Sequence, residues 1–279
     1  MLSAPLPFVF ALLWASSYIG AKIGLLDITP FAFVAVRLAI AATVAALLMR
    51  PLARAWPRAE RWPHLLFGGA LLHGFGLAMA HAALVSVDAT PTALVHAFHP
   101  ILTAALGTVL LHEKFHWWQW LGVALGFAGV VLGVPPGLGT GNLSLLGLSL
   151  FGLTAGTLYL KATCAQVAPF EATAVQLIGG ALVAILLLVL FESPHLRWTA
   201  PLIGAMTWNT LVMSILGMAI YNGMLERYGA AKASAGFFVV PGASALMAFA
   251  LLGEQLSALA IAGLVAATFG VMLVWRRRA

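Results

Sequence analysis

The chain has 279 residues, of which 62% are hydrophobic and only 8% are charged, whereas a typical soluble domain has roughly 25% charged residues. So few charges exclude a soluble globular protein, because they cannot cover its surface, and they indicate an integral membrane protein. The formal net charge of +6 would suit nucleic acid or another anionic partner, but the positions of the charges favour a topology signal, as described below.

Turn residues and charges divide the chain into ten apolar runs, each near the roughly 20 residues that span a bilayer. We expect a single all-α transmembrane domain, because backbone groups in hydrocarbon must be satisfied within their own segment and the runs lack the alternation of barrel strands. No cleavable signal is expected, since the first run contains Lys22 and has no clear cleavage site. The predicted spans are Leu6–Leu26, Phe31–Met49, Leu65–Val87, Pro91–Leu111, Trp117–Val134, Leu143–Cys164, Phe170–Phe191, Leu202–Tyr221, Ala233–Leu252 and Leu256–Trp275.

The basic residues gather on one side of this predicted bundle. That side carries Arg50, Arg54, Arg58, Arg61, Lys114, Arg227, Lys232, Arg276, Arg277 and Arg278. The opposite side has only Lys22 and Arg197 near its surface. The positive-inside rule therefore predicts an inner (plasma) membrane protein with both termini in the cytoplasm, and no nucleic-acid partner. A polybasic lipid or nucleic-acid site is the competing interpretation of the Arg50–Arg61 segment.

Two halves of the sequence share a pattern. Pro100 precedes Glu113 by 13 positions, and Pro241 precedes Glu254 by the same 13. At the same offset of 141, Gly122 and Gly129 fall on Gly263 and Gly270, and Gly126 and Gly133 continue a small-residue spacing that permits close helix contact. We therefore predict two five-span repeats, residues 1–138 and 139–279. Because five is odd, the second repeat is inverted, as is typical of secondary transporters.

These residues carry a family resemblance. Further residues of the same pattern are Leu13–Ser17 in the first span and Pro30–Arg37 in the second. On these residues and the repeated positions, the chain resembles the EamA-type ten-helix members of the drug/metabolite transporter superfamily. The resemblance implies movement of small metabolites through a central cavity lined mainly by spans 1, 3, 4, 6, 8 and 9. It does not fix the substrate, although amino-acid exporters are one branch that the chain approaches.

Four histidines lie at membrane depth. His73 and His81 are about two turns apart in the third span, and His96 and His99 are one turn apart in the fourth. Ionisable groups at this depth usually face a bundle interior or a water-filled cavity, so we predict that the four line the substrate cavity, with proton coupling as an additional hypothesis. The alternative for each is a neutral imidazole bonded to a backbone carbonyl.

Aromatic and amide side chains complete the predicted substrate site. We assign substrate binding to Trp14, Ser17, Tyr159, Trp208, Asn222 and Phe237, with Tyr18, Tyr221, Ser16, Thr157 and Asn209 as further members of the same wall. The competing interpretation of such aromatics is packing or an interfacial belt.

Prolines and one arginine inside the spans predict local structure. Pro100 and Pro241 each free a carbonyl four residues back and are predicted as conformational hinges, or alternatively as kinks that only shape packing. Thr90 before Pro91 predicts a helix N-cap. Arg37, two turns into the second span, is expected to bind a structural partner such as a span-end carbonyl or Asp27.

Residues 112–116 read His-Glu-Lys-Phe-His and match the zinc motif H-E-x-x-H. The motif falls in a short predicted turn, and the repeat already accounts for Glu113, so we expect neither a metal site nor any other cofactor.

The preferred function is a secondary transporter, an exporter of amino acids or similar zwitterionic or amphipathic metabolites, and not an enzyme. The alternatives are an intramembrane metal-dependent enzyme, a multidrug exporter and a channel. A cationic drug is disfavoured because no acidic residue is expected at the midplane. The sequence leaves a monomer and a homodimer equally open.

Overall fold

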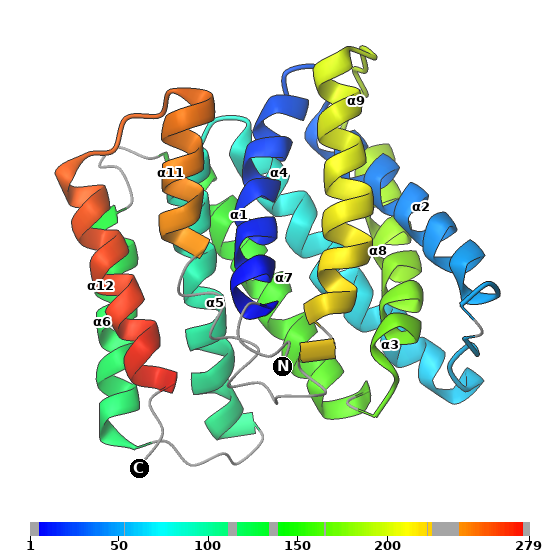
Figure 1. Ribbon diagram of the computed structural model, residues 1–279, viewed down its shortest axis with the longest axis horizontal. Coiled ribbons are helices and arrows are strands. Elements are labelled where there is room, and N and C mark those ends of the chain that lie inside the picture. The colour runs from blue at the N-terminus through cyan, green and yellow to red at the C-terminus, as the bar shows by residue number, and fades with distance from the viewer. Residues whose placement is uncertain are drawn as a thin grey trace.

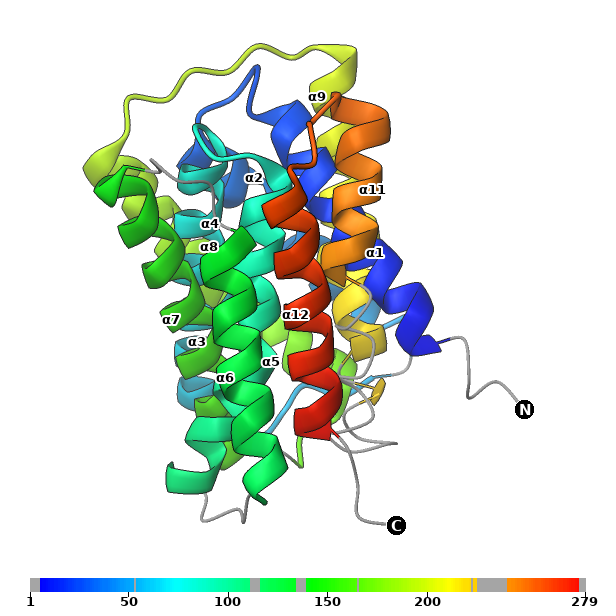
Figure 2. The ribbon, with the colours of Figure 1, turned by 90° about the vertical axis from the view of Figure 1, so that its left-hand side faces the viewer.

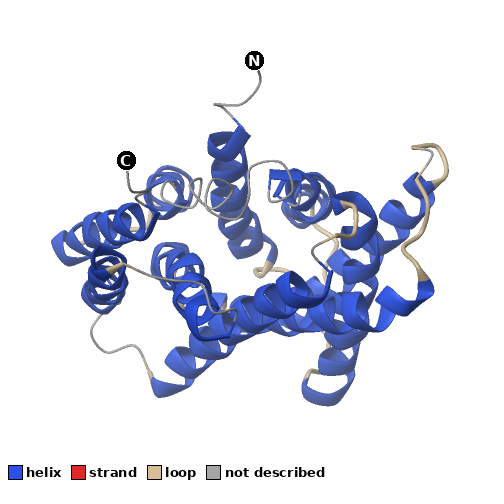
Figure 3. Cartoon of the chain, turned by 90° about the horizontal axis from the view of Figure 1, so that it is seen from below, coloured by secondary structure: helices blue, strands red, loops and turns tan. Residues whose placement is uncertain are grey.

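A computed structural model describes residues 6–52, 54–110, 116–133, 139–164, 166–221, 223–224 and 240–275. Across these ranges the regular structure is helical and no β-strand occurs, as the view from below also shows (Figure 3). Most helices stand upright in Figure 1, whereas α2 and the rod that contains α3 and α4 run obliquely to them. The predicted all-α class is therefore confirmed.

The first half of the bundle contains eight of the described helical elements. They are α1 (Leu6–Gly24), α2 (Pro30–Met49), η1 (Ala59–Arg61), α3 (Trp62–Gly69), η2 (Ala70–Gly76), α4 (Leu77–Leu84), α5 (Ala89–Leu110) and α6 (Trp117–Gly133). The second half contains α7 (Thr140–Cys164), α8 (Pro169–Phe191), α9 (Ala200–Thr207), η3 (Trp208–Gly217), α11 (Val240–Leu252) and α12 (Ala258–Trp275). The segments η2 and η3 are π-helical and continue the helices that flank them.

Six helical rods are long and apolar enough to cross a membrane. They are Pro30–Met49, Ala59–Leu84, Ala89–Leu110, Thr140–Cys164, Pro169–Phe191 and Ala200–Tyr221. Shorter apolar helices occupy Val9–Gly24, Trp117–Gly133, Val240–Leu252 and Ala258–Gly270. Apolar side chains as large as Val189 and Leu47 are more than 70% exposed on these helices, as expected for surfaces that face lipid. These helices are those of a multi-pass membrane protein.

The helices begin and end at one of two opposite ends of the bundle. At the lower end in Figure 1, α1 begins and α12 ends, and the segment between α2 and α3 lies there too. At the upper end, the segment between α8 and α9 crosses the molecule (Figure 2). It meets the turn after α1, where Ile28 and Leu196 form an isolated bridge and Arg197 forms an ion pair of 3.1 Å with Asp27. The upper end is thus held together by contacts between segments distant in sequence.

Glycines let α6 and α12 approach at backbone distance. A Cβ added at Gly129 would lie 2.5 Å from the backbone nitrogen of Ala267 and 2.7 Å from the carbonyl of Gly263. A Cβ at Gly263 would lie 2.6 Å from the carbonyl of Gly129. Real Cβ atoms cannot occupy such positions, so the close packing depends on glycine. The prediction of close helix contact from the glycine spacing is confirmed.

Glycines also allow η2 and α7 to pack at backbone distance. A Cβ at Gly152 would lie 2.9 Å from both the Cα and the nitrogen of Gly76, and a Cβ at Gly156 would lie 2.8 Å from the nitrogen of Leu72. Here too backbone faces backbone. The consequence is that the π-helical turn of η2 sits tightly against α7 and cannot shift without displacing it.

Two carboxylates from distant segments close helix N-termini at the upper end. Glu192 accepts hydrogen bonds from the backbone nitrogens of Phe31 (3.0 Å) and Ala32 (2.9 Å) at the start of α2. Glu254 accepts from the nitrogens of Ala89 (2.8 Å) and Thr90 (3.1 Å) and from the Thr90 hydroxyl (2.9 Å). An anion at a helix N-terminus satisfies orphan donors and complements the helix dipole.

The prediction that Thr90 is the N-cap of its helix was wrong. The helix α5 begins one residue earlier, at Ala89, and the Thr90 hydroxyl donates to Glu254. The capping oxygens come from the turn between α11 and α12, where Gly253 has a φ of 70° that favours glycine. A cap supplied from 164 residues away leaves no local signal in the sequence.

The glycine contact between α6 and α12 predicts a stability difference. Gly129→Ala should lower the free energy of unfolding by about 1–3 kcal/mol, because the new methyl group meets backbone atoms that cannot rotate away. The matched control is Gly147→Ala in α7, where a Cβ meets nothing within 4 Å and should leave stability unchanged or raise it slightly. Thermal unfolding of the purified variants measures both, and equal melting temperatures would refute the packing role of Gly129.

Candidate functional site

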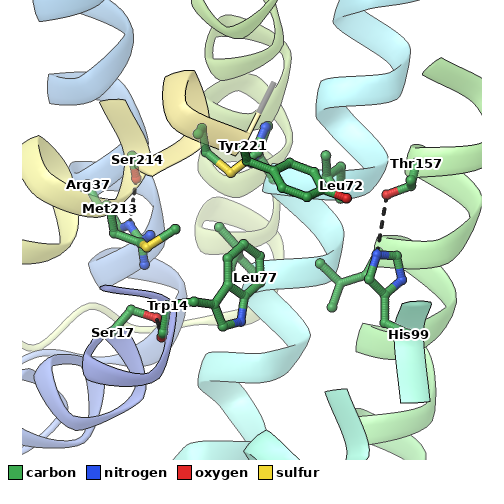
Figure 4. A pocket seen from close by; sticks show the side chains of 13 residues that line it. Trp14, Ser17, Arg37, Leu72, Leu77, His99, Thr157, Met213, Ser214 and Tyr221 are labelled. Carbon is green, nitrogen blue, oxygen red and sulfur yellow. Dashed lines mark hydrogen bonds between the residues drawn. The ribbon is translucent and has the colours of Figure 1, made fainter. Parts of the chain in front are cut away.

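A cavity lies within the bundle, lined by side chains from seven helical elements and from the turn of helix after η3 (Figure 4). Its empty space is about 580 Å³, a figure that includes the part open to the surroundings. The lining residues are Trp14, Ser17, Arg37, Leu72, His73, Leu77, His99, Leu153, Thr157, Met213, Ser214, Met218 and Tyr221.

The chemistry of this lining is mixed. Polar groups on the two sides of the cavity, Arg37 with Ser214 and His99 with Thr157, are separated by the aromatic and aliphatic side chains of Trp14, Leu77 and Met213 (Figure 4). No aspartate or glutamate belongs to this described lining. A cavity with apolar walls and a few polar groups is the usual form of a small-molecule site, and its one full charge is positive.

Arg37 is buried, with 4% of its surface exposed. Its Nε donates to the Ser214 hydroxyl (2.8 Å), and its Nη1 donates to the Asn209 carbonyl oxygen Oδ1 (3.1 Å). The sequence-based expectation of a structural partner for Arg37 is confirmed, but the partners are Ser214 and Asn209 and neither of the two examples, a span-end carbonyl or Asp27. Asp27 lies in the turn after α1 and pairs with Arg197 instead, because Arg37 is held two turns inside α2 and points into the bundle.

His96 is the centre of a hydrogen-bond chain and does not line the cavity. Its Nε2 lies 2.8 Å from the Ser149 hydroxyl, which donates to the carbonyl of Gly76 (2.8 Å). Ser149 therefore accepts from His96, which assigns the proton to Nε2 and leaves Nδ1 to accept from Tyr18 (2.9 Å). Tyr18 in turn accepts from Trp14 (3.1 Å). This series of hydrogen bonds connects Trp14, which lines the cavity, to the carbonyl of Gly76 at the end of η2.

His99 and His73 do line the cavity. His99 Nδ1 lies 3.1 Å from the Thr154 hydroxyl and 3.3 Å from that of Thr103, and Nε2 lies 3.5 Å from Thr157 (Figure 4). His73 Nε2 lies 3.4 Å from Gln176 Oε1. Both imidazoles are thus held by neutral groups at the edge of the space that a solute would fill.

The remaining predicted residues lie elsewhere. His81 Nδ1 donates to the carbonyl of Leu77 (2.8 Å), and its ring packs 5.1 Å from Phe33. Tyr159 is bonded to His64 (2.7 Å) outside the cavity, and Trp208, 41% exposed, donates to Ser16 (2.9 Å). Of the ten predicted substrate residues, four line this cavity, and they are Trp14, Ser17, His73 and His99. The assignment of substrate binding to any of the ten stays a prediction.

Several other predictions fall partly or wholly outside the described residues. Asn222 and Phe237 do so entirely. Pro100 lies inside α5, whereas Pro241 is the second residue of α11 as described, so the turn that precedes it is not covered. The hinge function of both prolines stays a prediction. Residues 112–115 of the histidine motif are not covered either, and His116 stacks on Trp118 with ring centroids 4.3 Å apart.

The sequence analysis missed the role of Arg37 and of the η3 face in the cavity. The sequence did indicate that Arg37 is buried, because a charged residue two turns inside an apolar span usually faces a bundle interior. Met213, Ser214 and Met218 carried no comparable signal, because their orientation depends on the π-helical register of η3. In the part of the chain that is described, no three histidine, cysteine, aspartate or glutamate residues gather as metal ligands would.

Comparison with known proteins places this geometry in context. The model of the EamA-like transporter family matches residues 2–134 and again residues 140–276. A protein of Streptantibioticus cattleyicolor named as a probable terminal-alkyne amino-acid exporter is 27% identical, over 95% of this chain and 90% of its own. A Salmonella typhimurium protein named as a probable amino-acid metabolite efflux pump is 25% identical, over 96% and 93%. A solved crystal structure superposes with a TM-score of 0.72 at 16% identity, covering 98% of this chain and 96% of that one, and so shows the same fold.

The different settings of the two histidines of α5 predict different effects of substitution. His96→Leu should lower the free energy of unfolding by about 1–3 kcal/mol, because it leaves the buried Tyr18 hydroxyl without its hydrogen-bond acceptor. His99→Leu should cost less stability, since Thr103 and Thr154 can donate to carbonyls of their own helices, and should instead weaken solute binding. Thermal unfolding of the ligand-free proteins and binding titrations separate the two effects. A larger stability loss for His99→Leu than for His96→Leu would contradict this assignment.

Proposed function

We propose a function for this chain from one premise: it belongs to the EamA-like transporter family, whose model matches both halves of its sequence. In our proposal it is a secondary transporter of the inner membrane that exports amino acids or similar zwitterionic and amphipathic metabolites. It does so by alternating access, in which a central solute site opens to one side of the membrane at a time.

The observation that carries this proposal is the mixed lining of the cavity. Arg37 and His99 come from the first half of the chain, and Thr157 and Ser214 come from the second (Figure 4). A solute held by both halves is the arrangement that allows one half to move against the other around it. A cavity lined by both halves therefore supports the proposal that the solute site lies there.

The ten-span, inverted-repeat architecture is part of the proposal. Support comes from the two family matches and from the opposite directions in which α1 and α7, and likewise α2 and α8, run in Figure 1. The π-helical segments add support, because η2 ends at Gly76 and η3 ends at Gly217, which are 141 positions apart. The same offset relates the starts of α6 and α12.

The choice of solute rests on the lining and on the relatives. No carboxylate belongs to the described lining, so a cationic drug would lack a counter-charge there. Two relatives bear names that refer to amino acids, and both names denote outward transport. An amino acid offers both a charged end for the polar groups and an apolar body for Trp14 and Met213. Multidrug export is the alternative that the experiment below also examines.

Transport itself is tested by counterflow in proteoliposomes. Vesicles preloaded with unlabelled L-leucine, L-methionine or L-phenylalanine should transiently accumulate the same labelled amino acid above its external concentration, and the initial rate should saturate. Vesicles without protein are the control. Failure of all three amino acids would contradict the proposal, and exchange of the cationic dye ethidium instead would favour a multidrug exporter. An imposed pH gradient across the same vesicles tests proton coupling.

Orientation is tested by cysteine labelling. After Cys164, which is buried, is replaced by alanine, a single cysteine is introduced at Leu26 at the upper end or at Trp56 in the arginine-containing segment, two positions that are 76% and 42% exposed. The positive-inside rule predicts that a membrane-impermeant maleimide labels Leu26→Cys in intact cells, and labels Trp56→Cys only after lysis. The reverse pattern would show that the termini lie outside the cytoplasm.

A further inference from the structure

The buried cation of the cavity has no anionic partner among the described residues. Both hydrogen-bond acceptors of Arg37, the Ser214 hydroxyl and the Asn209 amide oxygen, are neutral. The ion pairs found in the described ranges join other residues, namely Lys22 with Asp88, Arg54 with Glu171, and Arg197 with Asp27. A guanidinium at 4% exposure that lacks a counter-charge is costly, so its position calls for a function.

The guanidinium also retains unused donors. Arginine carries five N–H groups in a rigid fork, and the hydrogen bonds to Ser214 and Asn209 engage Nε and Nη1. The fork matches the two oxygens of a carboxylate, with which arginine forms paired, parallel hydrogen bonds. Because Arg37 lines the cavity, a solute that enters it reaches this residue directly.

The partners hold Arg37 in a fixed orientation. Ser214 donates its own proton to the carbonyl of Asn209 (3.1 Å), so its oxygen presents only lone pairs to Arg37. Asn209 donates through Nδ2 to the carbonyl of Ala205 (3.1 Å), which directs Oδ1 toward the guanidinium. Gly20 of α1 makes room for this amide, since a Cβ there would overlap it. The cation is therefore preorganised before any solute arrives, which reduces the entropy lost on binding.

We propose that Arg37 is the residue that binds the carboxylate of the transported solute. The proposal rests on the proposed export of amino acids and narrows it to solutes with a free carboxylate. The apolar body of the solute then lies along Trp14 and Met213, toward His99 and Thr157 on the other side of the cavity (Figure 4). Amides and decarboxylated amines of the same solutes lack the group that Arg37 recognises.

The test compares acids with their amides on purified protein. The probes are three matched pairs, L-leucine with L-leucinamide, L-methionine with L-methioninamide, and L-phenylalanine with L-phenylalaninamide, titrated by thermal stabilisation and in direct binding assays. At least one acid should bind the unmodified protein about tenfold or more tightly than its amide, as expected for the loss of a charged hydrogen-bonded pair. Arg37→Gln should abolish that preference and leave the affinity for the amide within about twofold.

Controls separate a binding role from a structural one. Arg197→Gln makes the same chemical change outside the cavity, at a residue that pairs with Asp27, and should keep the acid preference. If Arg37→Gln does not yield folded protein, the preference for the acid over its amide is measured on Arg37→Lys instead. Lysine keeps the charge but lacks the planar fork, so it should keep only part of the preference.

The two proposals fail in different ways. If acids and amides bind the unmodified protein equally, or if Arg37→Gln or Arg37→Lys keeps the full preference, the assignment of Arg37 is overturned while amino-acid export stands. If no acid binds and none undergoes counterflow, the proposed function is overturned and the assignment falls with it.

Discussion

Direct contact between helix backbones is the constraint on which the cavity depends. At Gly76 and Gly152 the backbones of η2 and α7 meet with no room for a Cβ, and Gly180 of α8 leaves equally little room beside His73. In a membrane, where lipid is as apolar as any side chain, helix association relies on such close packing. These contacts fix the wall from which Leu72 and His73 reach the cavity. Bulkier residues would separate the helices and open that wall.

The π-helical segments contribute part of the polar interior of the bundle, namely His73, Asn209, Thr210 and Ser214. The wider register of η3 lets the Ser214 hydroxyl donate to the Asn209 carbonyl five residues back, and η2 ends at the carbonyl of Gly76, which accepts from Ser149 of α7. Irregular backbone at membrane depth is tolerated where protein groups satisfy it. Both segments are bonded in this way, and both line the cavity. The irregular backbone therefore supplies orientation to the side chains that a solute would meet.

The sequence predicted the positions of helices well because the bilayer itself imposes their length and apolar composition. The predicted span Phe31–Met49 and the observed α2 differ by one residue at the start, and α6 begins at Trp117 as expected. The depth of Arg37 was also readable, since a charge inside an apolar run requires an interior partner. Its partner was not, because Ser214 lies 177 positions away along the chain and nothing local specifies that contact. His96 and His99 are one turn apart, yet His96 belongs to a buried hydrogen-bond series and His99 lines the cavity. This difference depends on the rotation of α5 about its axis and on the helices packed against it.

The carboxylate of Glu254 at the start of α5 has a consequence for how the protein is made. The two partners lie 165 residues apart along the chain, and a ribosome adding 5–20 residues per second needs roughly 8–33 s to cover that distance. The helix α5 is completed early in this interval, but the group that closes its N-terminus does not yet exist. Water or lipid headgroups must satisfy those backbone donors until the last helix pair arrives. The turn between α11 and α12 therefore completes a helix that was inserted long before it, and a chain truncated ahead of that turn leaves α5 open at its upper end.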